Sequence, residues 1–238
     1  MSARTVGALR AHFDIRNVQL LVERWVNEAT GESDRTNLIG DAAIRSALER
    51  RRVSVRTDSS LPFAGELRLV DNELVILLAD NLGHRRRRFT IAHELGHAAL
   101  FAIDSSLQQQ DGDTEKLCDA FAAELLMPRA YLMREAAQVE SYARLLLMLA
   151  GGAGASLPAA CIRVTECFGG AAGIASRGGK IQNEYGNCPG FVNPAERLER
   201  FANDPRTTFR SERVGRNWSL DAAYTGSQYV YVVRSIQG

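Results

Sequence analysis

One pentapeptide at residues 93–97, His-Glu-Leu-Gly-His, carries residue types at a spacing that could do chemistry. On a helix, His93 and His97 lie one above the other on a single face, so both imidazoles can reach one metal ion. Glu94 follows the first histidine and can lean over an open coordination position. This H-E-x-x-H arrangement is typical of zinc hydrolases, in which the glutamate accepts a proton from the metal-bound water. The pattern therefore predicts two metal ligands, His93 and His97, and a general base, Glu94.

The alternative interpretation of this pentapeptide is a surface helix whose two histidines are solvated. The flanking sequence argues against it, because apolar residues stand on both sides of the histidines between Phe89 and Phe101. A buried histidine pair without a partner would leave polar groups unsatisfied. Thr90 is expected to cap the start of this helix. Gly96 is costly in a helix interior, which indicates that something approaches the backbone closely there.

Length and composition fit a globular chain with one large domain or two small ones. The 238 residues are 45% hydrophobic and carry a net charge of +1, so no field over the whole chain points to nucleic acid or to a membrane. The sequence has no apolar run of about 18 residues, so no transmembrane helix is expected. The first residues lack the apolar core of a signal peptide. The four cysteines form no C-x-x-C pair and are expected to be reduced thiols. We therefore expect a cytoplasmic protein with no membrane partner.

A catalytic zinc ion needs a third protein ligand as well as an open position. No histidine follows His97, so the third ligand is expected to be a carboxylate on a following element. Glu115 and Asp119 are the informative candidates, because they lie four residues apart on one face of a helix expected over 114–126. One of them can bind the metal while the other accepts the free ring N–H of a ligating histidine. The other acids in this stretch are expected at the surface or on another helix face, and they are Asp104, Asp111, Asp113 and Glu124.

Two separated blocks of the sequence resemble the ImmA/IrrE family of metallopeptidases. Arg88–His97 is similar to that family's R-F-T-x-A-H-E-x-G-H block, and Glu115–Pro128 is similar to its E-x-x-A-[ND]-x-F-A-x-x-L-L-M-P block. Within about residues 50–135 the resemblance is close. It implies a zinc site with Mn²⁺ or Fe²⁺ as alternatives. The resemblance implies that His93, His97 and Glu115 bind the metal. It implies that Glu94 is the base and that Asp119 orients a ligating histidine.

Cys118 is a departure from this resemblance, because the family often has alanine at the matching position. We expect Cys118 to be a small buried packing residue. Redox control of the site through its thiol is the alternative.

The elements that must position the site can be placed from apolar periodicity and turn residues. A hairpin precedes the histidine helix, and its second strand, Glu73–Leu78, is either an internal strand or an edge strand that pairs with an extended substrate. The expected elements before the histidines are helices over 15–29 and 41–51, a strand from Val53, and this hairpin over 65–79 with its turn at Asp71-Asn72.

A change in composition near residue 169 suggests a boundary, because glycine becomes frequent and short strand-like runs appear. We expect residues 1–137 to form a zincin-like metallopeptidase domain of the α+β class, with a small mixed or antiparallel sheet and the active-site helices. Residues 138–168 are expected to be helical, either as a helix-turn-helix-like segment or as an ordinary helical pair that packs on the peptidase. Residues 169–238 are expected to form a small α+β region, too short for the GAF-like sensor found in one branch of the family.

The resemblance implies an intracellular zinc-dependent endopeptidase that cleaves a helix-turn-helix repressor at a specific site. Cleavage would relieve repression of stress-response or mobile-element genes. The expected partner is this protein substrate, and direct DNA binding is not expected because the net charge is near neutral. Two alternatives stay open: a non-proteolytic regulator that binds DNA or protein, and a toxin–antitoxin component that uses the same cleft. No feature of the sequence indicates the oligomeric state.

Overall fold

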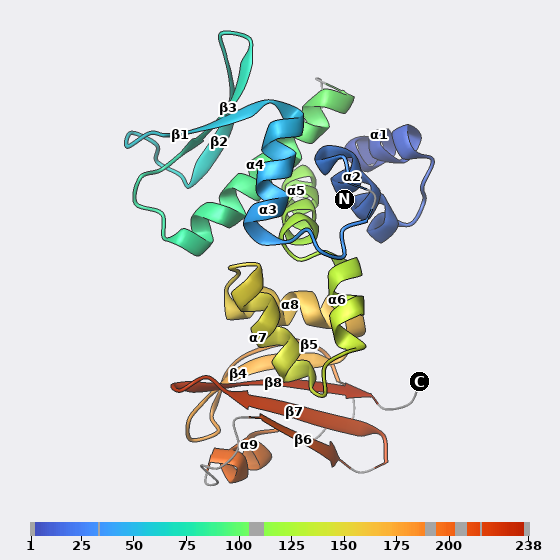
Figure 1. Ribbon diagram of the computed structural model, residues 1–238, viewed down its shortest axis with the longest axis vertical. Helices are drawn as coiled ribbons and strands as arrows, with labels where there is room; N and C mark the ends of the chain where they lie inside the picture. Colours follow the sequence, from blue (N-terminus) through green and yellow to red (C-terminus); the bar gives the residue numbers. More distant parts are fainter. Residues whose placement is uncertain are drawn as a thin grey trace. The chain divides into compact units, whose positions relative to one another are not determined.

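The chain folds into an α+β structure in which helices flank two separate sheets, as expected (Figure 1). The structure is a computed structural model that describes residues 3–32, 34–104, 112–188, 194–202, 209–214 and 216–235. Contacts divide the chain into two units, Met1–Tyr131 and Leu132–Gly238. The first unit thus ends before residue 137, and the helical segment expected at 138–168 belongs to the same unit as the C-terminal sheet.

The first unit contains a three-stranded mixed sheet with the order β1-β3-β2. β1 (Val53–Thr57) runs parallel to β3 (Glu73–Leu78), whereas β2 (Gly65–Val70) is antiparallel to β3. Asp71 and Asn72 join β2 to β3 with φ angles of 50° and 65°, as a tight two-residue hairpin turn requires. The interpretation of Glu73–Leu78 as an edge strand is therefore wrong, because β1 and β2 cover both of its edges. The outer strands β1 and β2 each leave one edge of this sheet unpaired among the described strands.

Helices cover one another and the sheet of the first unit. α3 and α4 contact the strands, and α5 packs on α2, α3 and α4. Trp25 of α2 and Phe121 of α5 are fully buried, with ring centroids 4.6 Å apart, and burial of such large apolar side chains is the main stabilising term in the core. These helices are α1 (Ala3–Phe13), α2 (Val18–Thr30), α3 (Gly40–Arg51), α4 (His84–Ile103) and α5 (Gly112–Leu126).

α4 starts earlier than the sequence pattern indicated. Its first helical residue is His84 and its N-cap is Gly83, so the expectation that Thr90 caps the helix is wrong. The four arginines before Phe89 continue the helix, since arginine is a good helix former. Thr90 instead lies buried in the helix interior, where its Cγ2 would stand 2.6 Å from a Cβ atom placed on Gly65 at the start of β2.

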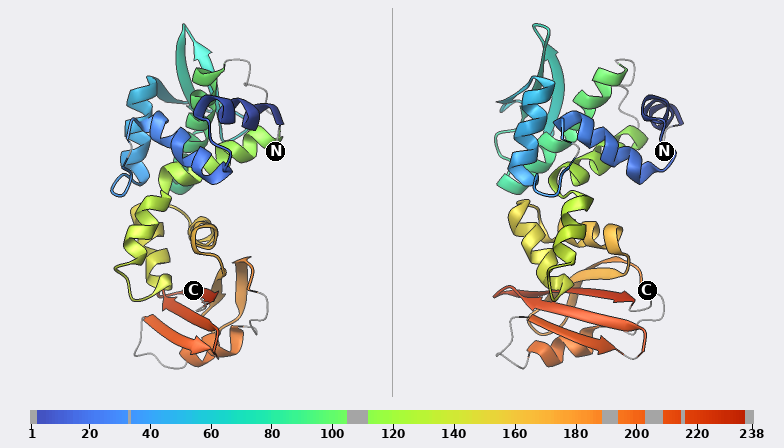
Figure 2. Two further views of the ribbon diagram at one scale, coloured as in Figure 1. Left: turned by 90° about the vertical axis from the view of Figure 1, so that its right-hand side faces the viewer. Right: turned by 45° about the vertical axis from the view of Figure 1, so that its right-hand side comes forward.

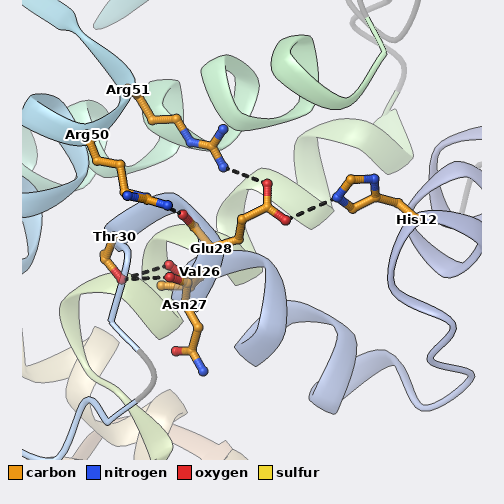
Figure 3. A network of polar contacts seen from close by, with 7 residues as sticks. All are labelled: His12, Val26, Asn27, Glu28, Thr30, Arg50 and Arg51. Atoms are coloured by element: carbon orange, nitrogen blue, oxygen red, sulfur yellow. Dashed lines mark hydrogen bonds and ion pairs between the residues drawn. The ribbon is translucent and has the colours of Figure 1, made fainter.

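Glu28 on α2 ties α1, α2 and α3 together (Figure 3). One carboxylate oxygen lies 3.1 Å from His12 Nε2, and the other accepts a hydrogen bond from Arg51 at 3.2 Å. The Nε–H of Arg50 donates to the Glu28 carbonyl oxygen at 3.1 Å. Burial raises the pKa of Glu28, but the contacts with His12 and Arg51 outweigh it, so the pKa is lowered. The network holds the helices that support α4 and α5.

The second unit is built on a five-stranded antiparallel sheet with the order β5-β4-β8-β7-β6. α7 and α8 pack on one face of this sheet, and α9 lies on the other (Figure 2). The strands are β4 (Ala171–Ser176), β5 (Ile181–Gly186), β6 (Phe209–Val214), β7 (Trp218–Tyr224) and β8 (Gln228–Ser235). The remaining helices are α6 (Arg129–Ala136), α7 (Tyr142–Gly152), α8 (Leu157–Phe168) and α9 (Ala195–Ala202).

Successive side chains of β7 point to opposite faces of this sheet. Leu220 packs in a cluster with Leu198 and Phe201 of α9. Asp221 points to the opposite face, where its buried carboxylate accepts a hydrogen bond from the backbone N–H of Tyr142 at 2.8 Å. This contact satisfies a backbone donor at the start of α7. It joins the start of α7 to the sheet of the same unit.

Candidate metal centre

α4 and α5 bring three donor groups to one point in the first unit. His93 and His97 lie one turn apart on α4, and their Nε2 atoms are 3.2 Å from each other. The carboxylate of Glu115 on α5 lies 3.1 Å from His93 Nε2 through one oxygen and 3.3 Å from His97 Nε2 through the other. These three residues form a group that could hold a metal ion.

The donor set fits a divalent ion. Glu115 Oε1 is buried and accepts no hydrogen bond from a described residue, and the two imidazole nitrogens face each other. Ligand atoms around a tetrahedral zinc ion with bonds of about 2.0–2.2 Å stand about 3.3–3.5 Å apart, close to the spacings seen here. Two imidazoles and one carboxylate are also the ligand types that zinc prefers.

Asp119 lies one turn beyond Glu115 on α5 and contacts the far side of the His93 ring. His93 Nδ1 is 2.9 Å from Asp119 Oδ1, so a proton on Nδ1 is donated to the carboxylate and Nε2 is left with a lone pair that faces the donor set. Burial lowers the pKa of His93, but the Asp119 hydrogen bond and the surrounding carboxylates outweigh it, so the pKa is raised. Burial and the neighbouring His93 lower the pKa of His97.

Glu94 is buried between α4 and β2, with 8% of its surface exposed. Its carboxylate accepts a hydrogen bond from the backbone N–H of Leu67, a residue that the sequence pattern did not single out. Burial, with smaller effects from Glu115 and Glu66, raises the pKa of Glu94 to about 7 against the opposing charge of His93. A carboxyl group with this pKa can take up and release a proton near neutral pH.

Gly96 explains how α4 and α5 approach closely enough to share the site. A Cβ atom at this position would stand 3.2 Å from Sγ and 3.3 Å from Cα of Cys118. The expectation that something approaches the backbone here is confirmed, and the element that does so is α5. Cys118 is fully buried, and burial raises the pKa of its thiol far above the ordinary range, as a packing residue requires and a redox-active thiolate does not.

Gly96→Val is expected to lower the free energy of unfolding by about 1–3 kcal/mol, because the added methyl groups force α4 and α5 apart. Urea unfolding of the metal-free protein measures the change. Gly7→Val is the matched control, since no atom lies within 4 Å of a Cβ at this helical position. Equal stability of the two variants would contradict close packing at Gly96.

The other acids considered as ligands lie elsewhere. Asp113 pairs with Lys116 at 3.4 Å, and Asp104 is the C-cap of α4. Glu124 is buried and accepts a hydrogen bond from the backbone N–H of Arg129 at the start of α6, a capping role that the sequence analysis did not assign. Asp111 lies outside the described residues.

Comparison with known proteins agrees with this geometry. Residues 48–165 match the sequence model of the IrrE N-terminal-like domain of the peptidase M78 family, and the match includes all the residues of the candidate site. The chain carries an IrrE N-terminal-like domain. This peptidase domain has a zincin-like fold of the expected α+β class.

The whole chain was also compared with solved structures and with curated proteins. A solved structure of a Mycobacterium tuberculosis transcriptional regulator has a similar fold, with a TM-score of 0.52 and 19% identity over 98% of this chain and 80% of that chain. A search of curated proteins finds no match. Among the described residues, none of the helices is long and apolar enough to cross a membrane.

Asp119→Asn in the IrrE N-terminal-like domain is expected to weaken zinc binding by about 10- to 100-fold, because the amide no longer fixes the His93 ring and its tautomer. Competition with a chromophoric chelator measures the affinity. Asp113→Asn removes a carboxylate from the same helix, away from the donor set, and should bind zinc as the wild type does. Unchanged affinity in Asp119→Asn would contradict the orienting role.

Proposed function

We propose that this protein is a zinc-dependent endopeptidase that acts in the cytoplasm and cleaves a helix-turn-helix transcriptional repressor at a specific site. The observation that carries the proposal is the position of Glu94, buried beside the His93, His97 and Glu115 donor set and in contact with the free-edge strand β2. The match to a peptidase family supports hydrolysis. The resemblance to regulators that cleave such repressors supports the substrate class and a role in a stress response or in control of a mobile element.

His93, His97 and Glu115 would hold the zinc ion. When bound, zinc supplies a Lewis acid that polarises the scissile carbonyl and lowers the pKa of a water molecule. Glu94 accepts the proton of the attacking water on its carboxylate and passes it to the leaving amide nitrogen. Asp119 keeps a proton on His93 Nδ1, so the opposite nitrogen stays available as a ligand.

β2 is the strand on which an extended substrate would pair. Leu67 sends its N–H toward Glu94, so the backbone groups at this position point away from β3. Because backbone groups alternate along an antiparallel strand, those of Gly65 and Leu69 point to the same free edge. A peptide can add to such an edge through main-chain hydrogen bonds. This role was considered for Glu73–Leu78, but that strand is internal.

A reporter assay in cells tests the proposed function. A candidate helix-turn-helix repressor from the same genome, sought first among the genes next to the one for this chain, is expressed with a reporter under its operator, together with either wild-type protein or Glu94→Gln. We expect wild-type protein to deplete the full-length repressor and induce the reporter, and Glu94→Gln to do neither. Equal induction by both proteins would favour the alternatives in which the cleft only binds a partner. Absence of induction and of repressor loss with wild-type protein would contradict this substrate class.

A further inference from the structure

Four consecutive basic side chains open α4 and form what we call the α4 basic patch: His84, Arg85, Arg86 and Arg87. The first three are exposed and Arg87 is half-buried. The positive charges of the three arginines stand at the start of a helix, where the helix dipole repels cations, and the N-cap Gly83 provides no side-chain hydrogen bond. Arginine side chains favour the helical backbone here, but their charges at the helix start do not stabilise the fold.

The next arginine shows what a structural role looks like in this region. Arg88 binds Asp41 of α3 through two guanidinium nitrogens, with Nε 2.6 Å from Oδ1, and the pair lowers the pKa of Asp41. By contrast, none of the described acids forms an ion pair with Arg85, Arg86 or Arg87. These three arginines of the α4 basic patch are thus available to an anionic partner.

Arg86 and Arg87 of the patch lie on the same face of α4 as the candidate metal centre, and Arg85 lies to one side of that face. Arg86 precedes His93 by seven residues and Arg87 precedes Glu94 by seven, which is two helical turns. Seven residues of helix span about 10.5 Å, the length of about three residues of extended chain. A peptide bound across the metal centre would reach the patch with its third or fourth residue from the cleaved bond.

β2 sets the direction in which such a peptide would run. Gly65 approaches Thr90, and Leu67 contacts Glu94 one turn later, so β2 and α4 run in the same direction. A peptide antiparallel to β2, the commoner strand arrangement, runs from the end of β2 toward its start. It therefore brings its residues on the C-terminal side of the cleaved bond to the patch.

We propose that the α4 basic patch binds an acidic segment of the substrate, three to four residues C-terminal to the cleaved bond. The inference rests on the proposed peptidase function and adds a sequence preference to it. An acidic peptide fits better than DNA, because the patch is a short run on one helix that leads into the catalytic face. A DNA-binding surface commonly makes 6–10 phosphate contacts, whereas the net charge of this chain is +1.

The test profiles cleavage of a proteome-derived peptide library by the full-length zinc-loaded protein, with cleavage sites read by mass spectrometry. Wild-type protein is expected to favour Asp or Glu at the third and fourth positions after the cleaved bond. Arg85→Glu/Arg86→Glu should lose this preference, with kcat/KM for acidic peptides roughly fivefold to tenfold lower at low ionic strength and less affected at high salt. Cleavage of peptides that are neutral at these positions should not change.

Arg16→Glu/Arg24→Glu is the matched control, because it reverses two exposed arginines of the same unit and changes the net charge equally. It should keep the acidic preference. A wild-type profile without acidic residues, or the same preference in the Arg85→Glu/Arg86→Glu variant, would overturn the inference.

A binding experiment separates this inference from the proposed function. Random peptides displayed on phage are selected on zinc-loaded Glu94→Gln, with and without the Arg85→Glu/Arg86→Glu change. Enrichment of acidic peptides that depends on the patch, with no cleavage by wild-type protein, would support the inference and contradict the peptidase. Cleavage by wild-type protein without an acidic preference would support the peptidase and overturn the inference. Failure to select acidic peptides, with patch-dependent binding of a random-sequence DNA duplex, would assign the patch to nucleic acid and overturn the inference.

Discussion

Glu94→Gln is expected to retain zinc while its kcat/KM for peptide hydrolysis falls by about 10²- to 10⁴-fold, the usual contribution of a general base. The amide has the same size, and its oxygen can still accept the hydrogen bond from Leu67. It cannot take a proton from water, however, and it is not one of the three residues of the donor set. Zinc content measured by elemental analysis and initial rates on one cleaved peptide give the two quantities.

Glu49→Gln is the control for this substitution, since Glu49 is an exposed acid on α3. It should match wild-type protein in both zinc content and rate. A Glu94→Gln protein that cleaves at the wild-type rate would show that another group accepts the proton. A variant that loses zinc as well would place Glu94 among the ligands.

Glu115→Ala is expected to weaken zinc binding by more than about 100-fold, because loss of a direct ligand costs more than the 10- to 100-fold typical of an outer partner. Zinc that binds only the folded state stabilises it by about 2.7 kcal/mol at a concentration 100 times its Kd. Wild-type protein should therefore unfold at a higher temperature with zinc than after treatment with EDTA. At the same zinc concentration the variant should show almost no difference.

Lys116→Ala provides the comparison, because Lys116 is the next residue on α5 and its side chain is mostly exposed. Its zinc-dependent rise in unfolding temperature should equal that of wild-type protein. An equal rise in Glu115→Ala would mean that Glu115 does not bind the ion, and the donor set would then need another third ligand.

The residues of the candidate site could be selected from the sequence because helical spacing is a local property. Positions four apart on α4 and on α5 share a face wherever the helices lie, so His93 with His97 and Glu115 with Asp119 followed from their numbers. That α5 lies close enough to contact His93 was indicated by the need for a third ligand and by the family resemblance, and Gly96 added only that some element approaches α4 closely. The contact with Leu67 depends on strand order, which no local pattern contains.

The errors in the fold have the same origin. Glu73–Leu78 was as compatible with an edge as with an internal position, because its apolar run does not reveal which strands pair with it. After residue 169 only the runs 207–214 and 228–236 indicated strands, so β4, β5 and β7 were missed. In β4 and β7 nearly all residues are buried on both faces, and the alternation that marks a half-buried strand is absent. Small residues such as Ala171 and Ala172 also give little strand preference.

Hydrolysis in ¹⁸O-labelled water tests the central claim most directly. Purified zinc-loaded protein is incubated with the helix-turn-helix repressor that the reporter assay selects, and intact masses are recorded over time. We predict two fragments whose masses sum to that of the repressor plus one water, with ¹⁸O in the new carboxyl terminus, and no fragments with Glu94→Gln. A repressor that stays intact with zinc, manganese and iron, or that is cut equally by Glu94→Gln, would contradict the account.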